Sequence, residues 1–178
     1  NGIEEADLIL LVGANPRFEA TIVNARIRKA FLNNSVKIIS LNDVGDLTYP
    51  YKFLDGKTQT IKDITENKNE VSKDIIDSKK PMIILGESFL NTKSANYLFY
   101  SFKNFLLKNN KFTDDWNPLN ILSVDAATVG SLDLDIINEN NEIFNKLNEN
   151  KFKIIYLLGQ DNLHFKKKDE FIIYQGSH

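Results

Sequence analysis

The chain has 178 residues, of which 42% are hydrophobic and 26% charged, a composition that supports a buried core and argues against disorder. Its formal net charge of −2 gives no global field to recruit nucleic acid or an anionic membrane, so no nucleic-acid partner is expected. The absence of cysteine excludes disulfides, thiolate zinc sites and cysteine-ligated iron–sulfur clusters within these residues. No apolar run approaches the roughly 20 residues that span a bilayer, so direct membrane insertion is not expected.

The first elements predicted are a buried strand and a helix. Residues 8–12 form an unbroken apolar run, which is typical of a strand covered on both faces of a parallel sheet. Gly13 allows a sharp turn after this strand, Asn15 is expected to cap the helix, and Pro16 suits its first position. The helix is predicted over residues 16–32, with a buried face formed by Ala20, Val23, Ile27, Ala30 and Phe31.

The rest of the chain alternates strand and helix patterns. An apolar run ends at a glycine, with a polar residue two positions later, at Gly13, Gly86 and Gly159. Further strands are predicted at 36–41, 82–85, 119–124, 154–158 and 171–174, and helices over 58–77, 92–108 and 138–148, with a loop at 43–56. This alternation indicates an α/β fold, a Rossmann-like parallel sheet with helices on both faces. We expect a single α/β region over 1–178, which could divide into Rossmann-like halves, 1–80 and 81–178.

The turn from Gly13 to Arg17 is the candidate ligand site. A helix start after a parallel strand offers free N–H groups and the positive end of the helix dipole, both suited to a phosphate. Arg17 could add a charge-assisted contact. The structural role of the turn explains every residue in it except Arg17, and an isolated glycine turn is a weak motif, so live cofactor binding is not favoured.

The other reactive side chains are interpreted as structural, and no catalytic residue is expected. His164 and His178 are far apart and neither has a second histidine at metal-binding spacing, so no metal site is expected. Ser88 lacks the second glycine of a nucleophile elbow, and a helix cap is the preferred interpretation. Trp116 is expected to pack in the core rather than against a neighbouring subunit. Several turn carboxylates are expected to face solvent: Asp114, Asp115, Asp133 and Asp135.

The amino-acid sequence of the first turn and helix is more specific than a strand–turn–helix unit requires. The run Gly-Ala-Asn-Pro-Arg-Phe-Glu-Ala at residues 13–20, followed by Asn24-Ala25-Arg26-Ile27-Arg28, closely resembles the large iron–sulfur subunit of NADH:quinone oxidoreductases, the respiratory complex I family. More matching segments follow in the family's order: Asp46–Tyr49, Lys80–Gly86, Asn120–Leu122, Leu132–Leu134 and Phe171–Gly176. This part of that subunit is similar to the molybdopterin oxidoreductases, such as formate dehydrogenase and DMSO reductase.

The resemblance implies a piece excised from a larger subunit. The cluster-binding cysteines of that subunit lie in its amino-terminal part, so no cofactor is expected in residues 1–178, and iron–sulfur clusters are expected elsewhere in the subunit. The implied role is a non-catalytic scaffold of the peripheral arm, which supports electron transfer from NADH to quinone. Its partners would be the rest of its own subunit and other peripheral-arm subunits, on the cytoplasmic side of a bacterial inner membrane or the mitochondrial matrix face.

Two alternatives stay open. In molybdopterin enzymes the corresponding Gly-x-Asn-Pro turn lies against the guanine dinucleotide of the pterin, so this chain could be a live cofactor-binding domain in which Gly13, Asn15 and Arg17 touch the dinucleotide. Those enzymes usually carry an Asp-Pro-Arg type segment after the second strand, whereas residues 42–46 here read Asn-Asp-Val-Gly-Asp, which argues against this alternative. The other alternative is a generic nucleotide-binding module that uses the same helix start.

Overall fold

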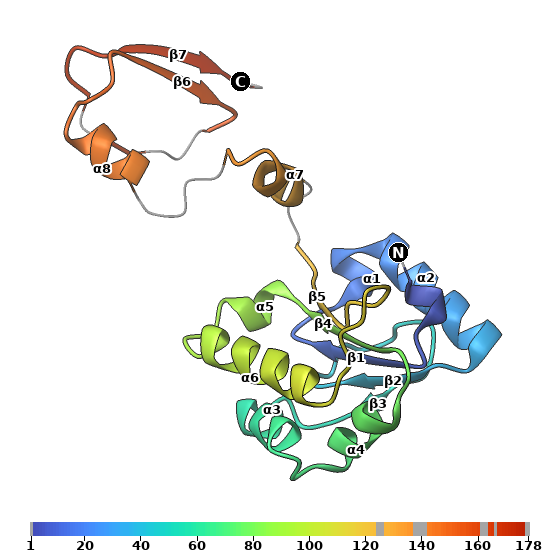
Figure 1. Ribbon diagram of the computed structural model, residues 1–178. Coiled ribbons are helices and arrows are strands. Elements are labelled where there is room, and N and C mark those ends of the chain that lie inside the picture. The colour runs from blue at the N-terminus through green and yellow to red at the C-terminus, as the bar shows by residue number, and fades with distance from the viewer. Residues whose placement is uncertain (1, 124–126, 137–141, 161–163, 166, 177–178) are drawn as a thin grey trace. The chain divides into compact units, whose positions relative to one another are not determined.

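The computed structural model describes residues 2–123, 127–136, 142–160, 164–165 and 167–176 (Figure 1). The chain divides into two compact units, residues 1–126 and 127–178. This boundary differs from the halves expected at residues 80 and 81, because the strand that begins at Pro81 pairs with the first strand and belongs to the same sheet. Among the described residues, no helix combines the length and the apolar character needed to cross a membrane.

The first unit contains a five-stranded, fully parallel sheet in the order β3-β2-β1-β4-β5. Its strands are β1 (Leu8–Val12), β2 (Lys37–Ser40), β3 (Lys52–Phe53), β4 (Pro81–Leu85) and β5 (Leu119–Ile121). Every residue of β1 and β4 is buried, as expected for central strands of a parallel sheet. The strand order reverses between β1 and β4, as in doubly wound folds, and the predicted α/β class is confirmed.

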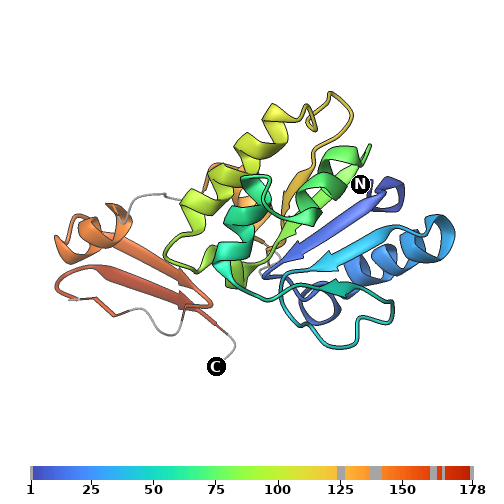
Figure 2. The same cartoon turned by 90° about the horizontal axis from the view of Figure 1, so that it is seen from below.

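Helices cover both faces of this sheet (Figures 1 and 2). One face packs against α3 (Thr58–Thr65), α4 (Glu70–Asp77), α5 (Glu87–Leu90) and α6 (Ala95–Lys108), and the other against η1 (Ile3–Glu5) and α2 (Thr21–Asn34). Side chains of β1 alternate between the two cores: Leu8, Leu10 and Val12 enter the first, and Ile9 and Leu11 the second. The unbroken apolar run of β1 therefore serves two separate hydrophobic clusters.

Several elements of the structure differ in their bounds from those predicted. The helix expected over 16–32 is divided into α1 (Pro16–Glu19) and α2, because Ala20 leaves the helical conformation with φ −154° and ψ 77°. The predicted loop at 43–56 contains β3, whose two exposed residues carry no periodic signal. The helix predicted from residue 92 begins at Ala95, and the strand predicted over 119–124 ends at Ile121.

The described residues of the second unit contain two short helices and a separate two-stranded parallel sheet. The helices are α7 (Thr128–Asp133), which the sequence analysis missed, and α8 (Glu142–Asn148). The strands β6 (Ile154–Leu158) and β7 (Phe171–Gln175) form where their apolar patterns predicted strands, but they pair with each other and not with the main sheet. Residues 138–141, where the second helix was predicted to begin, lie outside the described residues.

Candidate functional site

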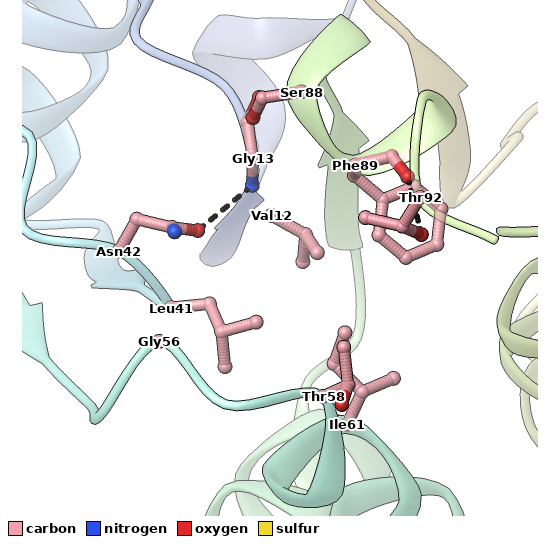
Figure 3. Close-up of a pocket in the computed structure, with 10 residues that line it drawn as sticks. All are labelled: Val12, Gly13, Leu41, Asn42, Gly56, Thr58, Ile61, Ser88, Phe89 and Thr92. Atoms are coloured by element: carbon pink, nitrogen blue, oxygen red, sulfur yellow. Dashed lines mark hydrogen bonds between the residues drawn. The ribbon is translucent and has the colours of Figure 1, made fainter. Parts of the chain in front are cut away.

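The candidate turn lies at the carboxyl end of β1, where the strand order of the sheet reverses (Figure 3). In open α/β sheets this position is the usual ligand crevice. Gly13 has φ +62°, in the left-handed region that favours glycine. Gly86, in the loop after β4, faces the same turn so closely that a Cβ there would overlap the Gly13 carbonyl oxygen and lie 2.5 Å from the Ala14 Cα. The two loops that would border a crevice are therefore in direct contact.

Helix α5 closes the turn from the side of β4. The Ser88 hydroxyl donates a hydrogen bond to the Gly13 carbonyl oxygen at 2.6 Å, and the Gly86 N–H donates to the Val12 carbonyl at 2.9 Å. A Cβ on Gly13 would lie 2.6 Å from the Phe89 nitrogen. The prediction that Ser88 caps a helix is wrong, because Gly86 occupies the cap position and Ser88 lies inside α5, where its hydroxyl reaches the neighbouring loop.

Two main-chain N–H groups of the turn, those of Gly13 and Asn15, already have partners. The Gly13 N–H donates to Asn42 Oδ1 at 3.1 Å (Figure 3), and the Asn15 N–H donates to Glu19 Oε2 at 3.1 Å. The Glu19 carboxylate thus stands at the start of α1, where a bound anion would otherwise sit. Because α1 has only four residues, its dipole is also short.

Arg17 is bound to the loop that follows β2. Its Nη1 atom lies 2.6 Å from Asp46 Oδ2 and also donates to the main-chain carbonyl of Asp46. The Thr48 N–H and the Arg17 guanidinium lower the pKa of the Asp46 carboxyl. This exposed ion pair adds little to stability, but it neutralises the one cation that the turn could offer to a phosphate.

A buried polar group fixes this loop to α2. Asn24 Nδ2 donates to the Leu47 carbonyl at 3.1 Å, and Asn24 Oδ1 accepts a hydrogen bond from the Tyr49 hydroxyl at 2.7 Å. Burial raises the pKa of the Tyr49 phenol, which keeps its proton available for this bond. Arg17 and Asn24 therefore both hold this loop through hydrogen bonds within the chain.

Asn15 does not cap α1 through its side chain, contrary to the prediction. Its carbonyl accepts from the N–H groups of Phe18 and Glu19, but with φ −118° and ψ 85° its side chain reaches the loop instead, where Nδ2 donates to the Val44 carbonyl at 3.1 Å. Asn15 Oδ1 is buried and has no hydrogen-bond partner among the described residues. This acceptor cannot bind a phosphate oxygen, which is an acceptor itself.

The cavity beside the turn is small. Polar groups of Gly13, Asn42 and Ser88 line one part of it, and the side chains of Leu41 and Ile61 line another (Figure 3). Its volume is about 70 Å³, room for about two water molecules at roughly 30 Å³ each. Ligand pockets usually measure about 300–1,000 Å³, so this cavity by itself does not enclose a nucleotide.

The other candidate residues are Trp116, the two histidines and the turn carboxylates. Trp116 is buried in the second core and its Nε1 donates to the Pro81 carbonyl at 2.8 Å, which confirms the core interpretation. His164 is exposed, and His178 lies outside the described residues. Within the part of the chain that the structure describes, no group of three or more His, Cys, Asp or Glu side chains could hold a metal ion. The turn carboxylates are exposed as predicted: Asp114, Asp115, Asp133 and Asp135.

Four residues that close the turn were not predicted from the sequence: Glu19, Asn42, Asp46 and Ser88. Glu19 had a local signal, since it follows Asn15 by four positions, one more than the spacing of a capping box. Asn42, Asp46 and Ser88 lie 29, 29 and 75 positions from their partners, so no local pattern could have found them.

Comparison with known proteins gives matches along the whole chain. The family model described as Molybdopterin oxidoreductase matches residues 1–178. The chain is 33% identical over 180 residues to the mitochondrial "NADH dehydrogenase (ubiquinone) iron-sulfur protein 1" of Solanum tuberosum, covering 100% of this chain and 24% of that protein. It is 36% identical over 179 residues to the "NADH-ubiquinone oxidoreductase 75 kDa subunit" of Reclinomonas americana, covering 99% and 26%.

A third relative is the mitochondrial "NADH-ubiquinone oxidoreductase 78 kDa subunit" of Candida albicans, 36% identical over 183 residues, covering 100% of this chain and 24% of that protein. The chain spans about a quarter of the length of these curated relatives. The resemblance to complex I subunits that the first turn indicated is confirmed by all three. Because the family model covers the entire chain and the fold is a doubly wound parallel sheet, the chain belongs to the molybdopterin oxidoreductase family.

Proposed function

We propose that the chain is part of the large iron–sulfur subunit of a proton-translocating NADH:quinone oxidoreductase, in which it serves as a non-catalytic structural domain of the peripheral arm. Relatives 33–36% identical over 99–100% of the chain bear the names of NADH dehydrogenase or NADH-ubiquinone oxidoreductase subunits, which supports membership of such a complex. Electron transfer from NADH to quinone would then proceed through flavin and iron–sulfur centres elsewhere in the complex, since the chain has no cysteine to hold a cluster.

The non-catalytic role is supported by one observation above all: the chain itself occupies the anion position of its first turn. A pterin dinucleotide would need free N–H groups and a free cation for its phosphates. The Asn15 N–H is bonded to the Glu19 carboxylate, and Arg17 is bonded to the Asp46 carboxylate. Both carboxylates would repel a phosphate, and the adjoining cavity of about 70 Å³ does not enclose a ligand of this size. These residues do not fit the cofactor of the family, and no chemical step is assigned to it.

The proposed partners are the rest of the same subunit and the other proteins of the peripheral arm. The domain would lie at the periphery of the membrane complex, on the cytoplasmic side in a bacterium or on the matrix side in a mitochondrion. Mitochondrial proteins among the relatives are in keeping with the second location. Iron–sulfur clusters are expected in the amino-terminal part of the full-length subunit.

Metal and pterin analysis of the purified parent protein tests this function. We expect iron and acid-labile sulfide in stoichiometric amounts, no molybdenum or tungsten, and no pterin after oxidative extraction. A tagged parent protein should also co-purify with NADH-oxidising activity. Stoichiometric molybdenum or tungsten with extractable pterin would contradict the scaffold proposal and favour the alternative, a live cofactor domain in which Gly13, Asn15 and Arg17 touch the dinucleotide.

Calorimetric titration with guanosine diphosphate separates the scaffold from a generic nucleotide-binding module. We expect no saturable heat for the unmodified protein or for Arg17→Gln, because the turn is closed in both. Tight binding that Arg17→Gln abolishes would contradict the scaffold proposal, since it would show that Arg17 is free to meet a phosphate.

A further inference from the structure

Helix α2 has a second apolar side, which faces solvent. Ile22 and Leu32 on this helix and Phe18 just before it are 77%, 67% and 80% exposed, the three highest fractions among large apolar side chains described in residues 2–123. Ile22, Ala25, Lys29 and Leu32 are all exposed and recur at intervals of three, four and three positions. That spacing places them in one row along a helix, here called the α2 stripe.

The residues of the α2 stripe are not the ones that pack α2 against the sheet. Asn24, Ile27 and Ala30 form the buried side of the helix, and Ile27 and Ala30 belong to the second core. A surface helix normally has polar side chains opposite its buried side. Single exposed apolar residues are ordinary, but a regularly spaced row on the far side of a helix is typical of a surface that packs against a second helix.

The charged side chains of α2 itself all have one sign. Helix α2 contains three basic residues and no acidic one, although the whole chain has a net charge of −2. Arg26 pairs with Glu4 at 2.5 Å, whereas Arg28 and Lys29 form no ion pair within 4 Å of any described residue and interact only at longer range, Arg28 with Asp46 and Lys29 with Glu4. A second copy of α2 on this surface would bring like charges together, which is unfavourable. The complementary surface is therefore apolar with acidic flanks.

We propose that the α2 stripe is covered by an amphipathic helix of the same parent polypeptide, from outside residues 1–178. This occupant has apolar residues at intervals of three and four and acidic residues facing Arg28 and Lys29. From the proposed function the inference takes only that the chain is part of a longer protein. The chain spans 24–26% of the length of its relatives, so about three quarters of such a polypeptide lies beyond it.

The size of the α2 stripe favours an occupant from the same polypeptide over a separate subunit. Ile22 and Leu32 of the stripe and the neighbouring Phe18 together present at most a few hundred square ångströms of apolar surface. A stable contact between separate proteins buries about 800 Å² on each partner. A covalently linked helix needs less area, because its effective concentration reaches the millimolar range.

Photo-cross-linking in the full-length protein, within its native complex, tests this proposal. A photoreactive phenylalanine derivative replaces Ile22 or Leu32 in separate variants, and Lys73, an exposed residue of α4, in the control. We expect both stripe positions to cross-link to one helical segment of the same polypeptide, beyond residues 1–178, that is rich in Asp or Glu. The Lys73 variant should not label that segment.

A charge variant gives a second readout. Lys29→Glu should lower the cross-linking yield from Leu32 about two- to fivefold relative to Lys29→Gln, because the glutamate adds a charge that repels the acidic residues of the occupant, whereas glutamine is neutral. The proposal is overturned if the cross-links lead to another subunit or stay within residues 1–178, if no cross-link forms, or if both Lys29 variants behave alike. Metal and pterin analysis decides the proposed function separately, so the two can fail independently.

Discussion

The hydroxyl of Ser88 donates a hydrogen bond to the carbonyl oxygen of Gly13, with 2.6 Å between the two oxygen atoms and 75 positions between the residues. The bond joins the loops that follow the two central strands β1 and β4. At this position of a doubly wound sheet, many proteins bind a ligand between the loops. Here the loops bind each other, so substitutions at the turn should act on folding stability.

Gly86→Ala should destabilise the fold by about 3 kcal/mol, because the new methyl group would overlap the Gly13 carbonyl oxygen. The backbone of Gly86, with φ −92° and ψ 172°, suits alanine, so the effect would be steric alone. Urea unfolding followed by circular dichroism measures it. Gly130→Ala in α7 is the matched control, with no atom within 4 Å of the new methyl group, and should be neutral or stabilising by up to about 1 kcal/mol. Equal stability of the two variants would contradict the closed turn.

Asn24→Leu should destabilise the fold by about 2–4 kcal/mol, because it leaves the Tyr49 hydroxyl and the Leu47 carbonyl buried without their partner. Adding Tyr49→Phe to this variant should restore part of the loss, since one unpaired polar group is removed. A double-mutant cycle by urea unfolding checks both values. Simple additivity of the two substitutions would mean that the hydrogen bond between Asn24 and Tyr49 does not form.

The ion pair between Glu4 and Arg26 should make the free energy of unfolding depend on pH in the acidic range. Two hydrogen bonds join them, Nε to Oε1 at 2.8 Å and Nη2 to Oε2 at 2.5 Å, and these bonds lower the pKa of Glu4 to about 2 from its usual value near 4.5. Because the unfolded chain binds the proton more readily, the contribution of Glu4 is fully present above about pH 4.5 and is lost as the pH falls toward 2. Glu4→Gln should therefore flatten the pH dependence of the unfolding free energy in this window.

NMR titration of the Glu4 carboxyl carbon measures this pKa directly. We expect a midpoint near 2 in the unmodified protein and a return toward 4.5 in Arg26→Gln, which keeps the side chain polar but removes its charge. A midpoint near 4.5 in both proteins would show that the ion pair is absent in solution.

Trp116, the single tryptophan of the chain, should report on the second core. With 7% of its surface exposed, it should have a blue-shifted emission maximum and little quenching by acrylamide. Trp116→Phe should cost about 1–3 kcal/mol, since the Pro81 carbonyl loses its buried donor. Circular dichroism under urea measures the loss, and red-shifted, strongly quenched emission from the unmodified protein would contradict this placement.

Local patterns in the sequence determined the elements of this protein and their class. The apolar run of residues 8–12, Gly13 with its positive φ, and Pro16 at the first helical position each act on their immediate neighbours, and their prediction held in the structure. The amino-acid sequence of the same segment also indicated the family. The break at Ala20 and the short strand β3 were not predicted, because neither carries a periodic signal.

Only the tertiary structure decided whether the candidate turn is open. That depends on Asn42, Asp46 and Ser88, which lie far from the turn in the sequence and meet it only after the sheet has assembled. The same holds for β6 and β7, whose apolar patterns suit a parallel strand but do not say which strand is the partner. Periodicity and turn chemistry act within a few residues, whereas strand pairing and the occupation of a turn are set by packing between distant segments.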